Sequence, residues 1–167
     1  MDDGVLELRD LLESDRDLLF SWRTDERINF WMLRDGPESK TEHDQWFGRQ
    51  LVDRESVFRV IVLRGIPVGI VSLHAEGGGQ MLSLGIYVSA DTIPAKGVGS
   101  EAVAKVLRLT DVFPAARCVK AEVFSDNLRA IRLYERLGFT RVAGSEREVL
   151  KGNAQRSVVC YEFLLGG

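Results

Sequence analysis

A glycine-rich turn at the start of a predicted helix is the first feature of this 167-residue chain that could carry chemistry. The turn reads Lys96-Gly97-Val98-Gly99-Ser100, and an apolar helical repeat follows it. The first backbone N–H groups of a helix have no partners within the helix, and the helix dipole favours an anion beside them. Because glycine lets a ligand approach the backbone closely, the turn can bind a phosphate. A plain helix entry with Ser100 as the N-cap explains the same residues.

The same segment also fits the Gly-x-Gly-x-x-Ala pattern of dinucleotide-binding folds, running from Gly97 to Ala102, with Glu122 about twenty residues further on. In those folds the first glycine directly follows its strand. Here the preceding strand is predicted to end at Val88, and what comes before it is a meander of antiparallel strands. A nicotinamide-dependent enzyme is therefore the weaker hypothesis.

Glu122 is a candidate acid–base residue because it lies in an alternating segment. Val119, Ala121 and Val123 alternate with Lys120 and Glu122, which predicts a strand with the charged side chains on one face. A carboxylate on a central strand is unfavourable unless it is paired or lies in a solvated cleft. Glu122 is thus either a salt-bridged structural residue or a catalytic one.

The predicted helix from Asn127 to Leu137 carries a tyrosine beside its apolar stripe, and Gly138 follows at the position typical of a helix end. Tyr134 lies at the edge of that stripe, where a buried hydroxyl usually has a hydrogen-bond partner. Asn127 occupies the place of an N-cap. Packing and capping are therefore the structural explanations for these two residues.

These residues must be positioned by the strands and helices around them. The order of those predicted elements indicates an α+β fold, with a mixed, mostly antiparallel central sheet flanked by helices, and not a doubly wound α/β fold. Strands are predicted over 5–9, 57–63, 68–73, 81–88, 119–124, 139–142 and 158–164. Helices are predicted to begin at Ser14, near Thr41, at the glycine turn (ending about Val112) and at Asn127, with a short helical stretch through Ile28 and Met32. No linker or repeat interrupts the pattern, so residues 1–167 are expected to form one domain.

Composition excludes several classes of protein. Hydrophobic residues make up 45% of the chain and charged residues 28%, with a net charge of −3, as in a globular protein with its own core. There is no dense basic run for nucleic acid and no apolar run of the ~18 residues that a membrane span needs. The acidic start of the chain differs from a signal peptide, so we expect a cytoplasmic protein. Cys118 and Cys160 are expected to be buried thiols, and His43 and His74 lie too far apart to suggest a metal site.

Taken together, these features resemble the GNAT superfamily of acetyl-CoA-dependent N-acetyltransferases. The glycine turn is similar to the pyrophosphate-binding motif of that family. The pattern Asn127-x-x-Ala130-x-x-x-Tyr134-x-x-x-Gly138-Phe139 matches its second characteristic helix residue for residue, and the resemblance runs from about Met81 to Phe139. One position departs from the family: Pro94 stands where Arg or Gln is usual, and the loop before the turn is longer. Lys96 is the side chain that can replace the missing contact.

The resemblance implies a cofactor site and two catalytic residues. Acetyl-CoA would bind with its pantetheine arm in a gap between the strand ending at Val88 and the strand 119–124, and coenzyme A would be the product. Tyr134 would protonate the departing thiolate, and Glu122 would remove the proton of the amine through water. The implied cofactor contacts are Ile86, Tyr87, Val88, Lys96, Gly97, Val98, Gly99, Ser100, Asn127 and Tyr134.

The N-terminal third resembles the N-acetyltransferases of UDP-linked amino sugars in pseudaminic acid biosynthesis, and more loosely ribosomal-protein and drug-modifying members. This resemblance implies acceptor contacts at Trp22, Arg23 and His43, with Arg23 able to bind a nucleotide phosphate. Trp22 is equally explained as helix core, and Arg23 by a surface ion pair. The expected partner is a small-molecule amine or a peptide N-terminus, and the chain is expected to be a monomer or homodimer. A non-catalytic acyl-CoA-binding module is the other alternative, and it would need neither Tyr134 nor Glu122.

Overall fold

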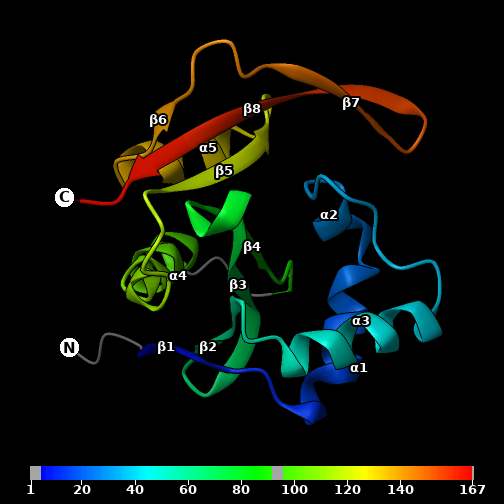
Figure 1. Cartoon of the computed structure of the whole chain (residues 1–167). Coiled ribbons are helices and arrows are strands. Elements are labelled where there is room, and N and C mark those ends of the chain that lie inside the picture. Colours follow the sequence, from blue (N-terminus) through cyan, green and yellow to red (C-terminus); the bar gives the residue numbers. More distant parts are fainter. Residues whose placement is uncertain (1–4, 92–95, 167) are drawn as a thin grey trace.

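The computed structural model describes residues 5–91 and 96–166, so Pro94 lies outside the described residues. An eight-stranded sheet in the order β1-β2-β3-β4-β5-β8-β6, with β7 paired to β8, runs through the molecule (Figure 1). All strand pairs are antiparallel except β4–β5, which is parallel. The strands are β1 Leu6–Asp10, β2 Ser56–Leu63, β3 Ile66–Glu76, β4 Met81–Val88, β5 Cys118–Phe124, β6 Thr140–Arg141, β7 Arg147–Lys151 and β8 Ala154–Leu164. The predicted mixed, mostly antiparallel α+β sheet is confirmed.

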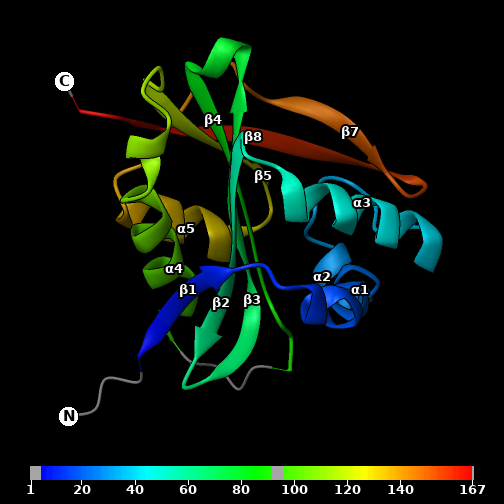
Figure 2. The same cartoon turned by 60° about the horizontal axis from the view of Figure 1, so that its bottom comes forward.

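The helices divide between the two faces of the sheet. Figure 2 shows α4 and α5 against one face and α1, α2 and α3 on the other side. The helices are α1 Arg16–Arg23, α2 Glu26–Asn29, α3 Lys40–Val52, α4 Val98–Leu107 and α5 Leu128–Arg136, with short 3-10 turns at Glu13–Asp15, Gly77–Gly79 and Thr110–Val112. We call the two sides of the sheet the α4–α5 face and the α1–α3 face.

Each face has its own apolar core. On the α4–α5 face Val103 and Leu82 are fully buried in a cluster that also includes Tyr134. On the α1–α3 face Leu19 and Phe47 are fully buried in a second cluster. Full burial of one such aliphatic or aromatic side chain contributes about 1.5–3 kcal/mol, so both helical layers are held firmly against the sheet.

The parallel pair β4–β5 is hydrogen bonded over only part of its length. The register pairs Met81 with Cys118 and Leu82 with Val119, and it ends where Ser83 pairs with Lys120. Beyond that point β4 continues to Val88 while it stays paired with β3 on its other edge. The edge of β4 that faces β5 is therefore without a strand partner from Leu84 onward, as in the gap that the sequence predicts.

Several helix boundaries differ from the prediction, and the short helical stretch predicted through Met32 ends at Asn29. The N-cap of α3 is Ser39, whose hydroxyl accepts a hydrogen bond from the Glu42 N–H at 3.1 Å, and not a residue from Thr41 onward. Helix α4 ends at Leu107 instead of near Val112. The Thr110 hydroxyl donates to the Leu107 carbonyl at 2.9 Å, and such side-chain bonds compete with continued helix.

The hairpin formed by β7 and the first half of β8 was not predicted from the sequence. The prediction places no strand at Arg147–Lys151 and starts the last strand at Val158, whereas β8 begins at Ala154. Most side chains of this hairpin are polar and at least partly exposed, so it lacks the apolar alternation that marks a strand. The last predicted strand before it, 139–142, shortens to Thr140–Arg141.

The two cysteines are less buried than the sequence predicts. Cys118 and Cys160 are free and partly buried. Within 5–91 and 96–166, no group of three or more His, Cys, Asp or Glu side chains could hold a metal ion. In the same ranges, no helix is both long enough and apolar enough to cross a membrane.

A buried carboxylate joins β1 to α1. Asp15 is 4% exposed and accepts hydrogen bonds from both terminal nitrogens of Arg9, at 2.7 and 2.8 Å, and from the Leu12 N–H at 2.8 Å. The expected N-cap Ser14 lies instead inside the 3-10 turn that precedes α1. Burial alone would raise the pKa of Asp15, but Arg9 and the Leu12 N–H outweigh it and hold this pKa below its ordinary value.

Asp15→Asn tests this junction. We expect the free energy of unfolding at pH 7 to fall by about 1–3 kcal/mol, because Arg9 loses a charged partner. Since the folded-state pKa is lowered, the stabilisation is present above the unfolded pKa of about 3.9 and is lost as pH falls below it. Urea unfolding at several pH values measures both effects. Asp17→Asn is the control, because that side chain is 86% exposed; an equal loss in both variants would contradict this account.

Candidate active site

The glycine turn presents free backbone donors at the start of α4. Gly97 is the N-cap, with φ +91°, and no side chain accepts a capping hydrogen bond there. Ser100 is therefore not the N-cap but lies in the first helical turn. The first intrahelical bond runs from the Glu101 N–H to the Gly97 carbonyl at 2.9 Å. Among the described residues nothing accepts a hydrogen bond from the N–H groups of Val98, Gly99 or Ser100. Three adjacent unpaired donors at a helix N-terminus form an anion-binding arrangement.

Gly99 also has a packing role that the sequence did not reveal. A Cβ at this position would lie 2.8 Å from the Leu133 Cδ1 atom of α5 and 3.9 Å from the Ile86 Cδ1 atom of β4. The absence of a side chain thus lets the first turn of α4 rest on α5 beside β4. A larger residue at 99 would disturb this packing as well as any bound phosphate.

The unpaired edge of β4 leads toward this turn. Ile86 and Val88 pack with the core of the α4–α5 face, whereas Tyr87 packs with the α1–α3 cluster. Their backbone groups follow the gap between β4 and β5. Exposed Lys96 precedes the turn.

Tyr134 lies on the α4–α5 face of the gap. Its ring is 5% exposed and its centroid is 5.4 Å from that of Phe139. Burial raises the pKa of Tyr134 to about 12, so the hydroxyl is protonated at neutral pH. No hydrogen bond to this hydroxyl forms within the described part of the chain, which leaves it available as a donor.

Asn127 is the N-cap of α5, as predicted. Its side-chain oxygen accepts a hydrogen bond from the Ala130 N–H at 3.2 Å. The side chain therefore has a structural partner already, and its amide nitrogen is the part left for a ligand.

Glu122 lies on the opposite face, because Val119, Ala121 and Val123 occupy the α4–α5 core. Its carboxylate is 3.0 Å from the Arg147 Nη2 atom, and the side chain is 32% exposed. Glu122 is thus both salt-bridged and open to water. Arg147 was missed because β7, the strand that carries it, was not predicted.

The three predicted acceptor contacts lie on the α1–α3 face, but in different surroundings. Trp22 is buried and meets the Tyr87 ring edge-on, with centroids 6.0 Å apart. His43 is fully buried, donates from Nε2 to the Arg16 carbonyl at 2.7 Å, and has its Nδ1 atom 3.1 Å from the Arg23 Nη1 atom. Burial lowers the pKa of His43, so the ring is neutral and Nδ1 accepts from Arg23. The structure thus makes His43 a support for Arg23, with no surface of its own toward a ligand.

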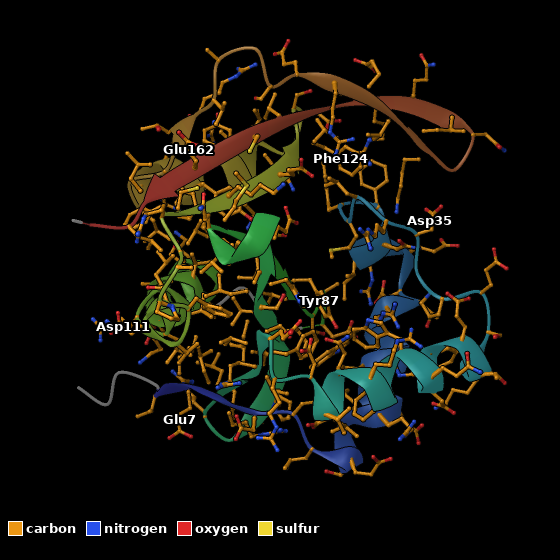
Figure 3. All side chains as sticks on the ribbon, viewed as in Figure 1. Glu7, Asp35, Tyr87, Asp111, Phe124 and Glu162 are labelled. Carbon is orange, nitrogen blue, oxygen red and sulfur yellow. The ribbon has the colours of Figure 1, made fainter. Side chains whose placement is uncertain are left out.

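The β7–β8 hairpin contacts helix α2 and the segment that follows it. The Lys151 ammonium contacts the Asn29 side-chain oxygen and the Asp35 carboxylate, each at 3.0 Å. The Arg156 guanidinium lies 3.7 Å from the centre of the Phe124 ring. In Figure 3, Tyr87 lies near the centre, with Phe124 above it and Asp35 above it and to its right.

Solved structures share this fold. A spermidine N-acetyltransferase from Vibrio cholerae in complex with CoA and spermine superposes with a TM-score of 0.84 and 18% identity, covering 95% of each chain. A GNAT acetyltransferase from Streptococcus pneumoniae gives 0.76 and 18%, covering 96% of this chain and 100% of that one. A domain from Methanocaldococcus jannaschii gives 0.76 and 23%, covering 98% and 100%. At these identities the likeness concerns the fold.

Sequence comparisons give the family. An uncharacterized protein of Methanocaldococcus jannaschii is 27% identical over 155 residues, which is 88% of this chain but only 31% of that protein's length. The model of the acetyltransferase (GNAT) domain matches residues 6–140. That match covers most of the chain, and it includes the gap between β4 and β5, the turn before α4, and helix α5. The chain therefore belongs to the GNAT family of acetyltransferases, whose acyl donor is acetyl-CoA.

Proposed function

We propose that residues 1–167 form one acetyltransferase domain that transfers acetyl from acetyl-CoA to a primary amine by direct attack. The observation that carries the proposal is the end of β4–β5 pairing at Ser83 and Lys120, which leaves a slot beside the unpaired amides of α4. A strand edge without a partner suits an extended ligand that has amide groups of its own. The three free amides suit the pyrophosphate at the other end of the same ligand.

The proposed roles follow from the two faces of the slot. Bound acetyl-CoA supplies an activated acetyl group. The backbone of Ile86–Val88 and the Asn127 amide hold the pantetheine arm. The pyrophosphate binds to the N–H groups of Val98, Gly99 and Ser100. Gly97 is the N-cap of the helix, and exposed Lys96 lies just before it.

Tyr134 and Glu122 act from opposite sides. The Tyr134 hydroxyl, protonated at neutral pH, gives its proton to the departing sulfur from the α4–α5 face. Glu122 receives the proton of the amine, through water, on the α1–α3 face, where its carboxylate is partly exposed. This pair of groups favours an enzyme over a non-catalytic acyl-CoA-binding module, which would need neither.

The acceptor in this proposal is a nucleotide-linked amino sugar that enters on the α1–α3 face, where Trp22 and Arg23 lie. The resemblance of the N-terminal third supports it. A protein N-terminus or a drug amine would use the same chemistry. The Vibrio cholerae structure, whose ligand is a polyamine, shows that this fold accommodates a small amine.

Ser100→Pro tests the amides of the turn. Proline fits the first turn of a helix, because the N–H that it removes has no intrahelical acceptor. We expect acetyl-CoA to bind about tenfold or more weakly in isothermal titration, since a hydrogen bond to a charged group contributes about 1.5–3 kcal/mol. Ser100→Ala keeps the N–H and is the matched control. Equal affinities in a folded Ser100→Pro protein and in Ser100→Ala would remove the turn from the site.

Tyr134→Phe tests the proton donor. The ring and its packing remain, so acetyl-CoA affinity is expected to stay unchanged while kcat and kcat/KM both fall about 10²-fold. Single-turnover kinetics separates this chemical step from product release. Tyr161→Phe removes a different buried hydroxyl, one that donates to Glu135, and is expected to keep its kcat. An unchanged single-turnover rate in Tyr134→Phe would assign the acid to another group.

Glu122→Gln tests the base through its pH profile. The loss of kcat/KM is expected to be largest at low pH and to shrink as pH rises, because free amine then becomes abundant. Arg147→Gln breaks the same ion pair but keeps the carboxylate, so its effect is expected not to follow this pH trend. Parallel, pH-independent losses in the two variants would reduce Glu122 to a structural role.

A further inference from the structure

Two side chains with unused hydrogen-bond donors, Tyr87 and Arg23, lie on the α1–α3 face on either side of Trp22. Arg23 follows Trp22 in the chain, and the Tyr87 ring centroid is 6.0 Å from that of Trp22. The Tyr87 hydroxyl is buried and has no hydrogen-bond partner among the described residues. Burial raises the pKa of Tyr87, while the nearby positive charge of Arg23 acts in the opposite direction. The hydroxyl is therefore protonated at neutral pH and can donate a hydrogen bond. A buried polar group left unpaired is unfavourable, and such groups often indicate a ligand.

Arg23 is held in place by neutral groups. Its guanidinium carbon lies 3.8 Å from the centre of the Trp46 ring, and its Nη1 donates to neutral His43 at 3.1 Å. Gly36 lies directly against the Arg23 backbone, because a Cβ at Gly36 would be 2.1 Å from the Arg23 carbonyl oxygen. His43 accepts only one of the five N–H bonds that a guanidinium can donate. No carboxylate within the described ranges forms an ion pair with Arg23.

Acidic side chains around this face are already neutralised by other cations. The ion pairs are Glu122 with Arg147 at 3.0 Å, Glu76 with Lys120 at 2.7 Å, Asp35 with Lys151 at 3.0 Å and Asp126 with Arg156 at 3.2 Å. The negative charge of Glu42 also acts on Arg23, and the Glu42 carboxylate accepts a hydrogen bond from the Glu38 N–H at 3.0 Å. Within the described part of the chain, Arg23 and the Tyr87 hydroxyl thus still have hydrogen bonds to donate, whereas these four carboxylates already have cationic partners.

We propose that the acceptor carries an anionic group, a carboxylate or a phosphate, near its amine, and that Arg23 and the Tyr87 hydroxyl bind this group. The inference rests on the proposed acetyltransferase function and specifies its acceptor. An anion supplies the lone pairs that both donors lack, and a guanidinium binds carboxylate or phosphate through two parallel hydrogen bonds. A polyamine would instead place ammonium groups against Arg23, which costs free energy. The acceptor class thus differs from that of the spermidine-acetylating structural relative.

A matched set of amines tests this proposal: β-alanine, aminoethylphosphonate, β-alaninamide and spermidine. The first three share a carbon chain and differ in the terminal group. With acetyl-CoA as donor, we expect kcat/KM for the better anionic amine to exceed that for the amide at least about tenfold, with spermidine the poorest. The preferred anionic amine identifies a carboxylate or a phosphate as the natural group.

Arg23→Gln is expected to bring the ratio of anionic amine to amide close to one, mainly through KM, while acetyl-CoA affinity measured by titration stays unchanged. Arg23→Lys keeps the charge but loses the planar fork, so it is expected to give an intermediate ratio. Arg16→Gln, on the same helix but paired with Glu13, is the control that keeps the wild-type ratio.

The possible outcomes distinguish failure of the proposed acetyltransferase function from failure of the proposed anionic acceptor. Absence of acetyl-CoA binding would refute the proposed function itself. Acetyl-CoA binding with no acetylation of either anionic amine, or with preference for the amide or spermidine, would overturn the anion proposal alone. The same holds if the ratio survives in both folded Arg23 variants.

Discussion

The hydrogen bonds between β4 and β5 end at Ser83 and Lys120, and the rest of the site depends on this interruption. In the middle of a sheet, a strand edge without a partner leaves backbone groups unsatisfied, which a protein normally avoids. Here β4 stays paired with β3 and β5 with β8, so only the two edges that face each other are left without a strand partner. An extended ligand with amide groups can satisfy that edge. In this account the backbone of β4 binds the ligand, and side chains add selectivity for it.

The two faces of the slot are held by different contacts, and this separates the chemical roles. On the α4–α5 face, the bare Cα of Gly99 lets the first turn of α4 pack on Leu133, which brings this turn against the helix that carries Tyr134. On the α1–α3 face, Trp22 against Tyr87 anchors the helix that carries Arg23. In the proposed site, the groups assigned to donor binding and to acceptor recognition belong to separate clusters, so substitutions in one need not alter the other.

The parts of the site that the sequence predicts are those encoded locally. The N-cap Asn127, the inward Tyr134 and the glycine turn each show in a short motif, because capping and helical periodicity involve neighbouring residues. Arg147 could not be predicted, since β7 has no apolar alternation and meets Glu122 only after the chain turns back along β8. The burial of His43 was missed for a similar reason: its partners, Arg16 and Arg23, come from another helix. Long-range pairing of polar groups leaves no periodic pattern.

Amide hydrogen exchange with and without acetyl-CoA tests the central claim most directly, because it reports on the backbone groups that the slot leaves unpaired. The account predicts new protection in two segments far apart in the sequence, the β4 edge over Ile86–Val88 and the first turn of α4 over Val98–Ser100, with NAD giving none. Strong binding of acetyl-CoA without protection of either segment would contradict it, and so would protection confined to other parts of the chain.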